Sequence, residues 1–262
     1  METIKAAGHR IAFEQQGDGP PVVFLHGGVG DRRTWRRQLD ALADEFTVVA
    51  WDAPGFGGSS DPPEAFPLSA FADCLAAFIR ALGLGRPHVV GLSFGGGLAL
   101  ELYRRHPTLP AKLVLAGAYA GWAGSLPADE VERRLQLALR LAGLPAEQLV
   151  AEQLPTMFSD AAPPEAVDEF AAIIAGVHPA GLRANARAFA QADLRDVLPR
   201  IDVPTLLLYG DADVRAPLTV ARELHARIPG AELVILEGVG HVSPIEAPDR
   251  FNDAVRAFLS SG

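Results

Sequence analysis

Short runs rich in valine, leucine and isoleucine recur along the chain, and each ends at glycine, aspartate or serine. They span residues 21–28, 46–55, 87–93, 111–118, 203–211 and 231–238. Because these runs are apolar on both faces, they are typical of strands in a parallel sheet that helices cover on both sides. Residues 10–16 instead alternate between apolar and polar positions, as a half-buried strand does.

Segments with the period of an amphipathic helix lie between these runs. They span residues 34–46, 68–83, 96–107, 218–229 and 247–261. Strands that alternate with helices indicate right-handed crossover connections and an open, doubly wound sheet. The pattern therefore predicts an α/β protein.

Residues 120–200 interrupt this alternation, because no strand-like run occurs there. Four helical segments fill the interval, and each begins at a proline, which is favoured in the first turn of a helix. They span residues 127–143, 145–158, 163–177 and 179–198. We predict a four-helix lid inserted between the sixth and seventh strands, which divides the chain into core residues 1–119, lid residues 120–200 and core residues 201–262.

The composition narrows the possible partners. Of the 262 residues, 49% are hydrophobic and 21% are charged, which suits a folded domain with a large core. The net charge of −9 disfavours nucleic acid as a partner, since phosphate binding needs a basic surface. Cys74 is the only cysteine, so neither an internal disulfide nor a cysteine metal cluster can form. Its place in an apolar helical pattern predicts a buried thiol.

The first residues of the sequence lack the basic start, apolar stretch and small-residue cleavage site of a signal peptide. No apolar run approaches the roughly 18–20 residues that a membrane helix needs. We therefore expect a cytoplasmic protein without a membrane partner, acting as a monomer or homodimer.

A serine stands where the run 87–93 gives way to a helix. Gly91 and Gly95 flank Ser93 at two residues on either side. A sharp turn between strand and helix needs glycines at these places, because the two segments approach closely and the backbone of the serine is strained. Such a turn presents the hydroxyl at the carboxyl edge of the sheet, where ligands of open α/β sheets bind. Ser93 is therefore the candidate nucleophile.

A serine hydroxyl needs a base, and the base needs an orienting carboxylate. Among seven histidines, His241 follows the run 231–238 and precedes a helix, which puts it at the same edge of the sheet. Two aspartates follow the run 203–211. We expect Asp211 to cap the turn and Asp213, further into the loop, to reach the histidine. The order Ser93, Asp213, His241 is the nucleophile–acid–base order of this kind of fold.

Backbone N–H groups must stabilise the negative oxygen of an acyl-transfer intermediate. The glycine-rich loop 26–30 follows the third strand and lets the backbone approach such an oxygen. We assign one donor to Gly28, with Val29 as its competitor, and the other to Phe94, directly after the serine.

Five motifs together resemble the α/β-hydrolase superfamily, in its order and over essentially the full length. They are "HGGVG", "WDAPGFGGSS", "GLSFGG", "GDAD" and "GVGH". The resemblance is strongest to small bacterial carboxylesterases and enol-lactonases. It implies a mostly parallel eight-stranded sheet with helices on both faces and an inserted lid. It also implies that Asp52 and His26 have structural roles.

The resemblance implies a serine hydrolase that cleaves a small carboxylic ester or lactone without a metal or organic cofactor. Carbon–carbon bond hydrolases and proline-releasing peptidases share the triad, and some receptors and signalling proteins of this fold keep it as well. Dehalogenases and epoxide hydrolases are disfavoured, because they carry an aspartate where Ser93 stands. We expect Arg215 to be a solvated surface residue, although it could meet an acidic substrate. The expected substrate-contacting residues are Val29, Trp35, Tyr119, Trp122, Met157, Phe158, Val214 and Val242, together with Phe94.

Overall fold

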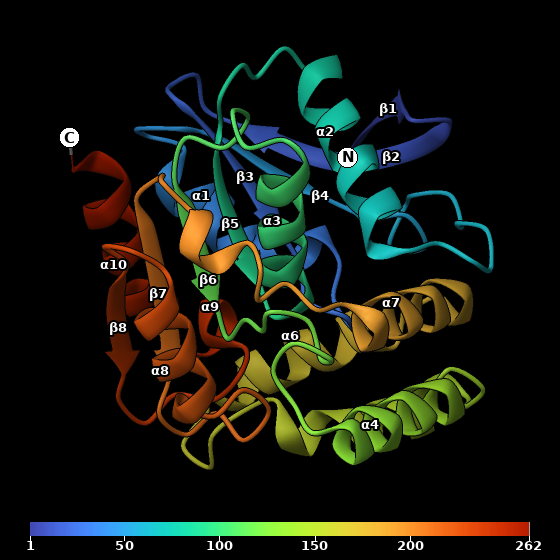
Figure 1. The fold of residues 1–262 in the computed structure, drawn as a ribbon. Coiled ribbons are helices and arrows are strands. Elements are labelled where there is room, and N and C mark those ends of the chain that lie inside the picture. Colours follow the sequence, from blue (N-terminus) through green and yellow to red (C-terminus); the bar gives the residue numbers. More distant parts are fainter. Residues whose placement is uncertain (262) are drawn as a thin grey trace.

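The computed structural model describes residues 1–261, which contain one eight-stranded sheet (Figure 1). The strands lie side by side in the order β1-β2-β4-β3-β5-β6-β7-β8. Their bounds are β1 Glu2–Ala6, β2 His9–Gln16, β3 Pro21–Leu25, β4 Thr47–Trp51, β5 His88–Leu92, β6 Leu113–Ala116, β7 Thr205–Gly210 and β8 Glu232–Leu236. The strands from β4 to β8 in this order pair in parallel, and β1 and β2 pair antiparallel at one end. The predicted α/β class with a mostly parallel sheet is confirmed.

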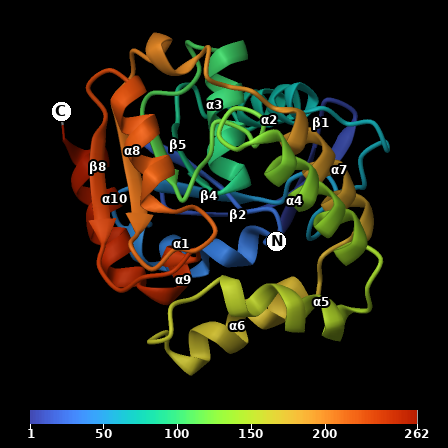
Figure 2. The ribbon, with the colours of Figure 1, turned by 60° about the horizontal axis from the view of Figure 1, so that its bottom comes forward.

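Helices cover both faces of the sheet (Figures 1 and 2). One face packs against α2 Leu68–Ala81, α3 Phe94–Arg105 and α8 Leu218–Arg227. The other packs against α1 Arg36–Leu42, α9 Ser243–Glu246 and α10 Pro248–Ser260. A short 3₁₀ helix, Arg32–Trp35, precedes α1. No helix within residues 1–261 has both the length and the apolar character needed to cross a membrane.

Strand β3 illustrates why the central runs are continuously apolar. Val23 and Leu25 point into the core on the α2 and α3 side, and Val22 and Phe24 point into the core on the α1 and α10 side. All four side chains are fully buried. Burying a side chain of this size stabilises the fold by about 1.5–3 kcal/mol, so the sheet is anchored from both faces at once.

The two ends of the sheet differ from the sequence-based prediction. Strand β1 was not identified there; it forms a hairpin with β2 through Ala7 and Gly8, both of which have positive φ. Strand β8 was expected to be buried on both faces, but it lies at the edge and Ile235 is 43% exposed. An edge strand pairs with only one neighbouring strand and is less completely covered by helices than a central strand. The apolar composition of residues 231–238 therefore did not reveal that β8 lies at the edge.

Four α-helices occupy the connection between β6 and β7, and we call them the inserted helices. They are α4 Ala128–Leu141, α5 Ala146–Gln153, α6 Pro164–Ile174 and α7 Pro179–Gln191. Figure 2 shows α4 beside α7 at the right of the molecule, and α5 and α6 along its lower edge. Short 3₁₀ turns at Leu154–Thr156 and Leu198–Arg200 complete this connection.

Candidate active site

Ser93 occupies a strained turn between β5 and α3. Its φ of 55° and ψ of −113° lie in a region that residues with a side chain rarely adopt. The flanking glycines permit this turn, because a Cβ at Gly91 would lie 2.3 Å from the Gly95 carbonyl oxygen, and a Cβ at Gly95 would lie 2.2 Å from that of Leu25. The strain is thus held by close backbone packing on both sides of the serine.

Gly91→Ala is expected to destabilise the protein, because the added methyl group meets backbone that cannot move aside. We expect a loss of about 3 kcal/mol or more, which corresponds to a fall in Tm of roughly 5–10 °C for a domain of this size. Thermal unfolding followed by circular dichroism measures it. Gly143→Ala is the control, since a Cβ there meets only the Arg140 carbonyl oxygen, at 3.4 Å. Equal Tm values for the two variants would contradict the close packing at the turn.

Asp213 and His241 form a buried pair after β7 and β8. The His241 Nδ1 lies 2.7 Å from Asp213 Oδ2, and the backbone N–H groups of Arg215 and Ala216 donate to Asp213 Oδ1 at 2.8 and 2.9 Å. Burial alone would raise the pKa of Asp213, but the attraction of His241 and these hydrogen bonds hold it below its ordinary value. The carboxylate is therefore ionised and fixes the imidazole with Nε2 free. Asp211 instead accepts from the Gly238 N–H at 2.6 Å, which is the turn-capping role predicted for it.

The loop that carries His241 is fixed by residues on both sides. The N–H groups of His241 and Val242 both donate to the Met157 carbonyl oxygen, at 2.9 and 3.1 Å. The buried Glu246 carboxylate accepts from the Gly240 N–H at 2.9 Å. On the opposite side, a Cβ at Gly117 would lie 3.2 Å from the imidazole ring, so the glycine that ends β6 makes room for the pair.

The loop 26–30 lies beside Ser93, since a Cβ on Gly27 would be 3.6 Å from the Cβ of Ser93. Within residues 1–261, the backbone N–H groups of Gly28, Val29 and Phe94 donate to no protein oxygen, so they are free to bind one from a ligand. His26 supports this loop. Burial lowers the pKa of His26, and the neutral ring accepts from the Ala53 N–H at 3.0 Å and donates to the Gly27 carbonyl oxygen at 2.8 Å.

Ser93 and His241 face one cavity of about 800 Å³, counting its open mouth. Gly28 and Phe94 line it, as do most of the residues expected to contact substrate: Val29, Tyr119, Trp122, Met157 and Val242. All of these expected contacts except Trp122 are buried. Within residues 1–261, no group of three histidine, cysteine, aspartate or glutamate side chains is arranged to hold a metal ion.

Three residues predicted to contact substrate lie elsewhere. Trp35 is fully buried in the core, with its ring 4.9 Å from that of Phe24. The side chain of Val214 is 69% exposed. Its two neighbours, Asp213 and Arg215, point inward, and the turn between them directs Val214 to the outside. Phe158 packs edge-on against Phe170, 5.9 Å between ring centroids, and does not line the cavity.

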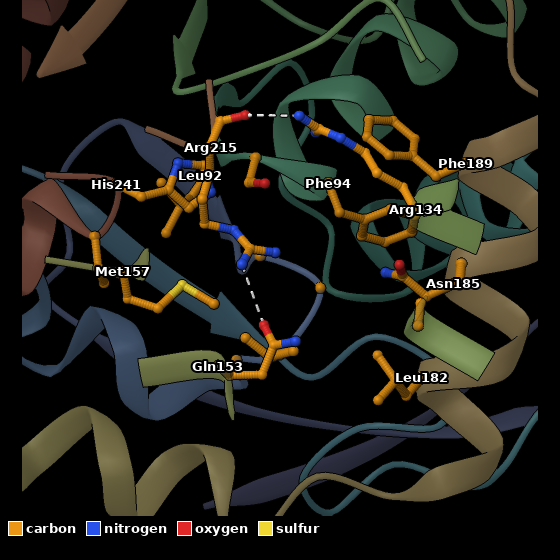
Figure 3. Close-up of a pocket in the computed structure, with 18 of the residues that line it drawn as sticks. Leu92, Phe94, Arg134, Gln153, Met157, Leu182, Asn185, Phe189, Arg215 and His241 are labelled. Atoms are coloured by element: carbon orange, nitrogen blue, oxygen red, sulfur yellow. Dashed lines mark hydrogen bonds between the residues drawn. The ribbon is translucent and has the colours of Figure 1, made fainter. Parts of the chain in front are cut away.

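The structure adds cavity residues that sequence reasoning missed, and most come from the inserted helices. They are Arg134, Leu141, Gln153, Phe170, Leu182, Asn185 and Phe189. Arg215, expected as a solvated surface residue, also lines the cavity (Figure 3). The amphipathic pattern of these helices revealed an apolar face for each, but not which residues of that face lie over the cleft. The place of Arg215 two residues after Asp213 was a local signal for it, whereas Arg134 had none.

Comparison with known proteins identifies the family of this chain. The family model described as alpha/beta hydrolase fold matches residues 20–248, which is most of the chain. The chain belongs to the α/β-hydrolase family. This member of the family thus contains the strand order described above, a strained serine after β5 and an Asp–His pair after β7 and β8.

The relatives of this α/β hydrolase include an esterase, an enol-lactonase and a putative carbamate hydrolase. A thermophilic esterase from Thermogutta terrifontis matches with a TM-score of 0.92 and 30% identity, covering 99% of this chain and 98% of its own. The enol-lactonase from Burkholderia xenovorans LB400 matches with a TM-score of 0.89 and 25% identity, covering 99% and 100%. A putative carbamate hydrolase, RutD, from Caulobacter sp. strain K31 is 31% identical over 98% of this chain and 97% of its own.

Proposed function

We propose that this α/β hydrolase cleaves a small carboxylic ester or lactone through an acyl-enzyme on Ser93. The observation that carries the proposal is the convergence of Ser93, the buried Asp213–His241 pair and three unpaired backbone N–H groups on one cavity. Nucleophile, base, orienting acid and oxyanion donors are the parts that acyl transfer to water needs. The esterase and the enol-lactonase among the structural neighbours support the same class of substrate.

The first half of the reaction forms the acyl-enzyme. Ser93 Oγ attacks the carbonyl carbon while His241 Nε2 takes the hydroxyl proton, and Asp213 stabilises the imidazolium that results. The N–H groups of Phe94 and of Gly28 or Val29 donate to the oxyanion. The carbon–oxygen bond then breaks, and His241 returns the proton to the leaving alkoxide, which stays tethered to the acyl group when the substrate is a lactone.

The second half releases the acid. Water attacks the acyl-enzyme while His241 again acts as the base, and collapse of the second tetrahedral intermediate restores the Ser93 hydroxyl. No step needs a metal ion or an organic cofactor.

Turnover tests the proposal against a receptor role for the same fold. Purified protein is offered p-nitrophenyl esters of increasing acyl length and a series of small lactones, with product followed over many enzyme equivalents. We expect many turnovers of at least one ester or lactone, with an initial burst where deacylation is slow. A single slow turnover per molecule across the whole panel would contradict an enzyme and indicate a sensor.

We further propose that residues 120–200, which contain the inserted helices and Met157, form a lid that sets substrate size. Met157→Ala enlarges the cavity beside His241, so it is expected to shift the preferred acyl length upward by one or two carbons. Phe158→Ala is the matched control, because the neighbouring side chain lies outside the cavity and should cost stability without changing preference. Relative kcat/KM values along the acyl series measure both. The same shift in the two variants would contradict a direct role for Met157 in selecting the acyl chain.

A further inference from the structure

Arg215 brings a guanidinium group into the active-site cavity without a carboxylate to balance it. Its Nη1 donates to Thr156 Oγ1 at 2.8 Å and to Gln153 Oε1 at 3.2 Å, and both acceptors are neutral. Within residues 1–261, no aspartate or glutamate oxygen lies within ion-pair distance of this guanidinium. Arg215 is half-buried, and a charge partly removed from water is stabilised by a counter-charge, so the group can bind an anionic partner that the chain does not supply.

The neighbouring charged groups do not neutralise Arg215. Arg134, the other arginine of the cavity, shares the Glu130 carboxylate with Arg133, each at 2.7 Å, so that carboxylate offers nothing to Arg215. Asp213 accepts from the backbone N–H of Arg215, but its other oxygen is held by His241. Burial, followed by repulsion from Arg134, lowers the pKa of the Arg215 guanidinium. The cavity therefore carries excess positive charge close to the catalytic loop, and Arg215 has no carboxylate partner of its own.

We propose that the natural ester or lactone carries a carboxylate, which binds the Arg215 guanidinium while Ser93 attacks the carbonyl group. The proposal rests on the serine-hydrolase function proposed above and names its substrate class. A guanidinium presents parallel N–H donors that match the two oxygens of a carboxylate. Within residues 1–261 only the Nη1 atom of this guanidinium donates to protein acceptors, so its Nε and Nη2 donors are free for the two oxygens of one planar anion.

The opposite side of the cavity fits the rest of such a molecule. Phe94, Leu182 and Phe189 form an apolar wall there, and the Arg215 guanidinium lies between that wall and Met157 (Figure 3). The Asn185 side-chain nitrogen on the same side is buried and has no hydrogen-bond partner within residues 1–261. A carbon chain can lie along the wall while the amide binds a polar atom and Arg215 binds the terminal carboxylate.

The first experiment measures selectivity between matched esters. Monomethyl esters of dicarboxylic acids from succinate to suberate are compared with neutral methyl esters of the same length. We expect wild-type protein to prefer one acidic ester, and Arg215→Met to reduce the ratio of acidic to neutral kcat/KM by roughly 10- to 100-fold, the worth of a charge-assisted hydrogen-bonded pair. Arg222→Met is the control: it removes the same charge from an exposed site on α8, outside the cavity, and should leave the ratio unchanged.

Gln153→Glu separates recognition from a structural role for Arg215. This nearly isosteric change places a carboxylate where the amide oxygen now lies 3.2 Å from Nη1, so the arginine gains an internal counter-ion. The protein should remain folded and keep Arg215, yet its preference for the acidic ester should fall about as far as in Arg215→Met. If Arg215 served only to hold Gln153 and Thr156, the ratio would be unchanged in Gln153→Glu, and that result would overturn the proposal.

Equilibrium binding gives a readout that does not depend on turnover. Calorimetry with wild-type protein compares adipate and glutarate with 1,6-hexanediol and inorganic phosphate. We expect a dicarboxylate to bind, the diol not to bind, and Arg215→Met to weaken dicarboxylate binding at least roughly 10-fold. Tighter, Arg215-dependent binding of phosphate, or equal binding of diol and dicarboxylate, would overturn the carboxylate assignment. Hydrolysis of neutral esters without dicarboxylate binding would contradict this inference but not the proposed function. Dicarboxylate binding without cleavage of any ester or lactone would contradict the proposed function but not the carboxylate site.

Discussion

Ser93→Ala is expected to lower kcat for ester hydrolysis by about 10⁴- to 10⁶-fold, as loss of the nucleophile does in serine hydrolases of other folds. The rate falls so far because alanine has no oxygen to attack the carbonyl group, so only binding and the free N–H groups remain to accelerate the reaction. Alanine tolerates the positive φ at this position no worse than serine, so Tm should change by only a few degrees. Steady-state rates on the best ester, paired with thermal unfolding, measure both effects.

Ser243→Ala serves as the control for this variant. Ser243 is buried two residues after His241, yet its side chain does not line the cavity. It should retain near-normal turnover. A Ser93→Ala protein that is folded and hydrolyses esters at a rate close to that of Ser243→Ala would contradict a nucleophilic serine.

Asp213→Asn is expected to lower kcat by about 10⁴-fold or somewhat less, the size of the same change in a serine protease. The neutral amide oxygen of asparagine accepts a hydrogen bond more weakly than a carboxylate does. Its N–H can also donate to His241 Nδ1, which favours the tautomer with the proton on Nε2, where the base must be free. The imidazolium formed in the transition state would also lose its counter-charge. The variant should fold, because the N–H groups of Arg215 and Ala216 still find an oxygen.

Asp211→Asn is the matched comparison, since it removes the same charge two residues away. Asp211 accepts from the Gly238 N–H and does not contact His241, so we expect less than about a 10-fold loss of kcat and a modest fall in Tm, since the asparagine oxygen still accepts but without the charge that strengthens the bond. Rates measured on the same ester under the same conditions decide between the two aspartates. A larger loss for Asp211→Asn would contradict the assignment of the acid.

The positions of Ser93, Asp213 and His241 could be predicted because strand ends are easy to find. Each follows a short apolar run, and the carboxyl ends of parallel strands meet at one edge of the sheet. The close approach of Gly91 to Gly95 was likewise visible as two glycines around a serine. Local sequence determines these features, since they depend on the polypeptide within a few residues of each strand.

The walls of the cavity depend on tertiary packing, and there sequence reasoning was less successful. Met157 and Phe158 are neighbours of similar character, yet one side chain lines the cavity and the other packs against Phe170. Trp35 lies in the core because the 3₁₀ helix that carries it turns inward against the sheet. The position of Arg215 in the cavity follows from the conformation of the turn after Asp213. None of these outcomes has a periodic signal that a single sequence could reveal.

The measurement that tests the account most directly is mass spectrometry of the protein after reaction with a fluorophosphonate probe. The serine-hydrolase account predicts one adduct per molecule, located by peptide fragmentation on Ser93. It also predicts that labelling slows strongly in Asp213→Asn and does not occur at this position in Ser93→Ala. An unlabelled Ser93 in protein that cleaves esters, or a primary adduct on another residue, would contradict the account.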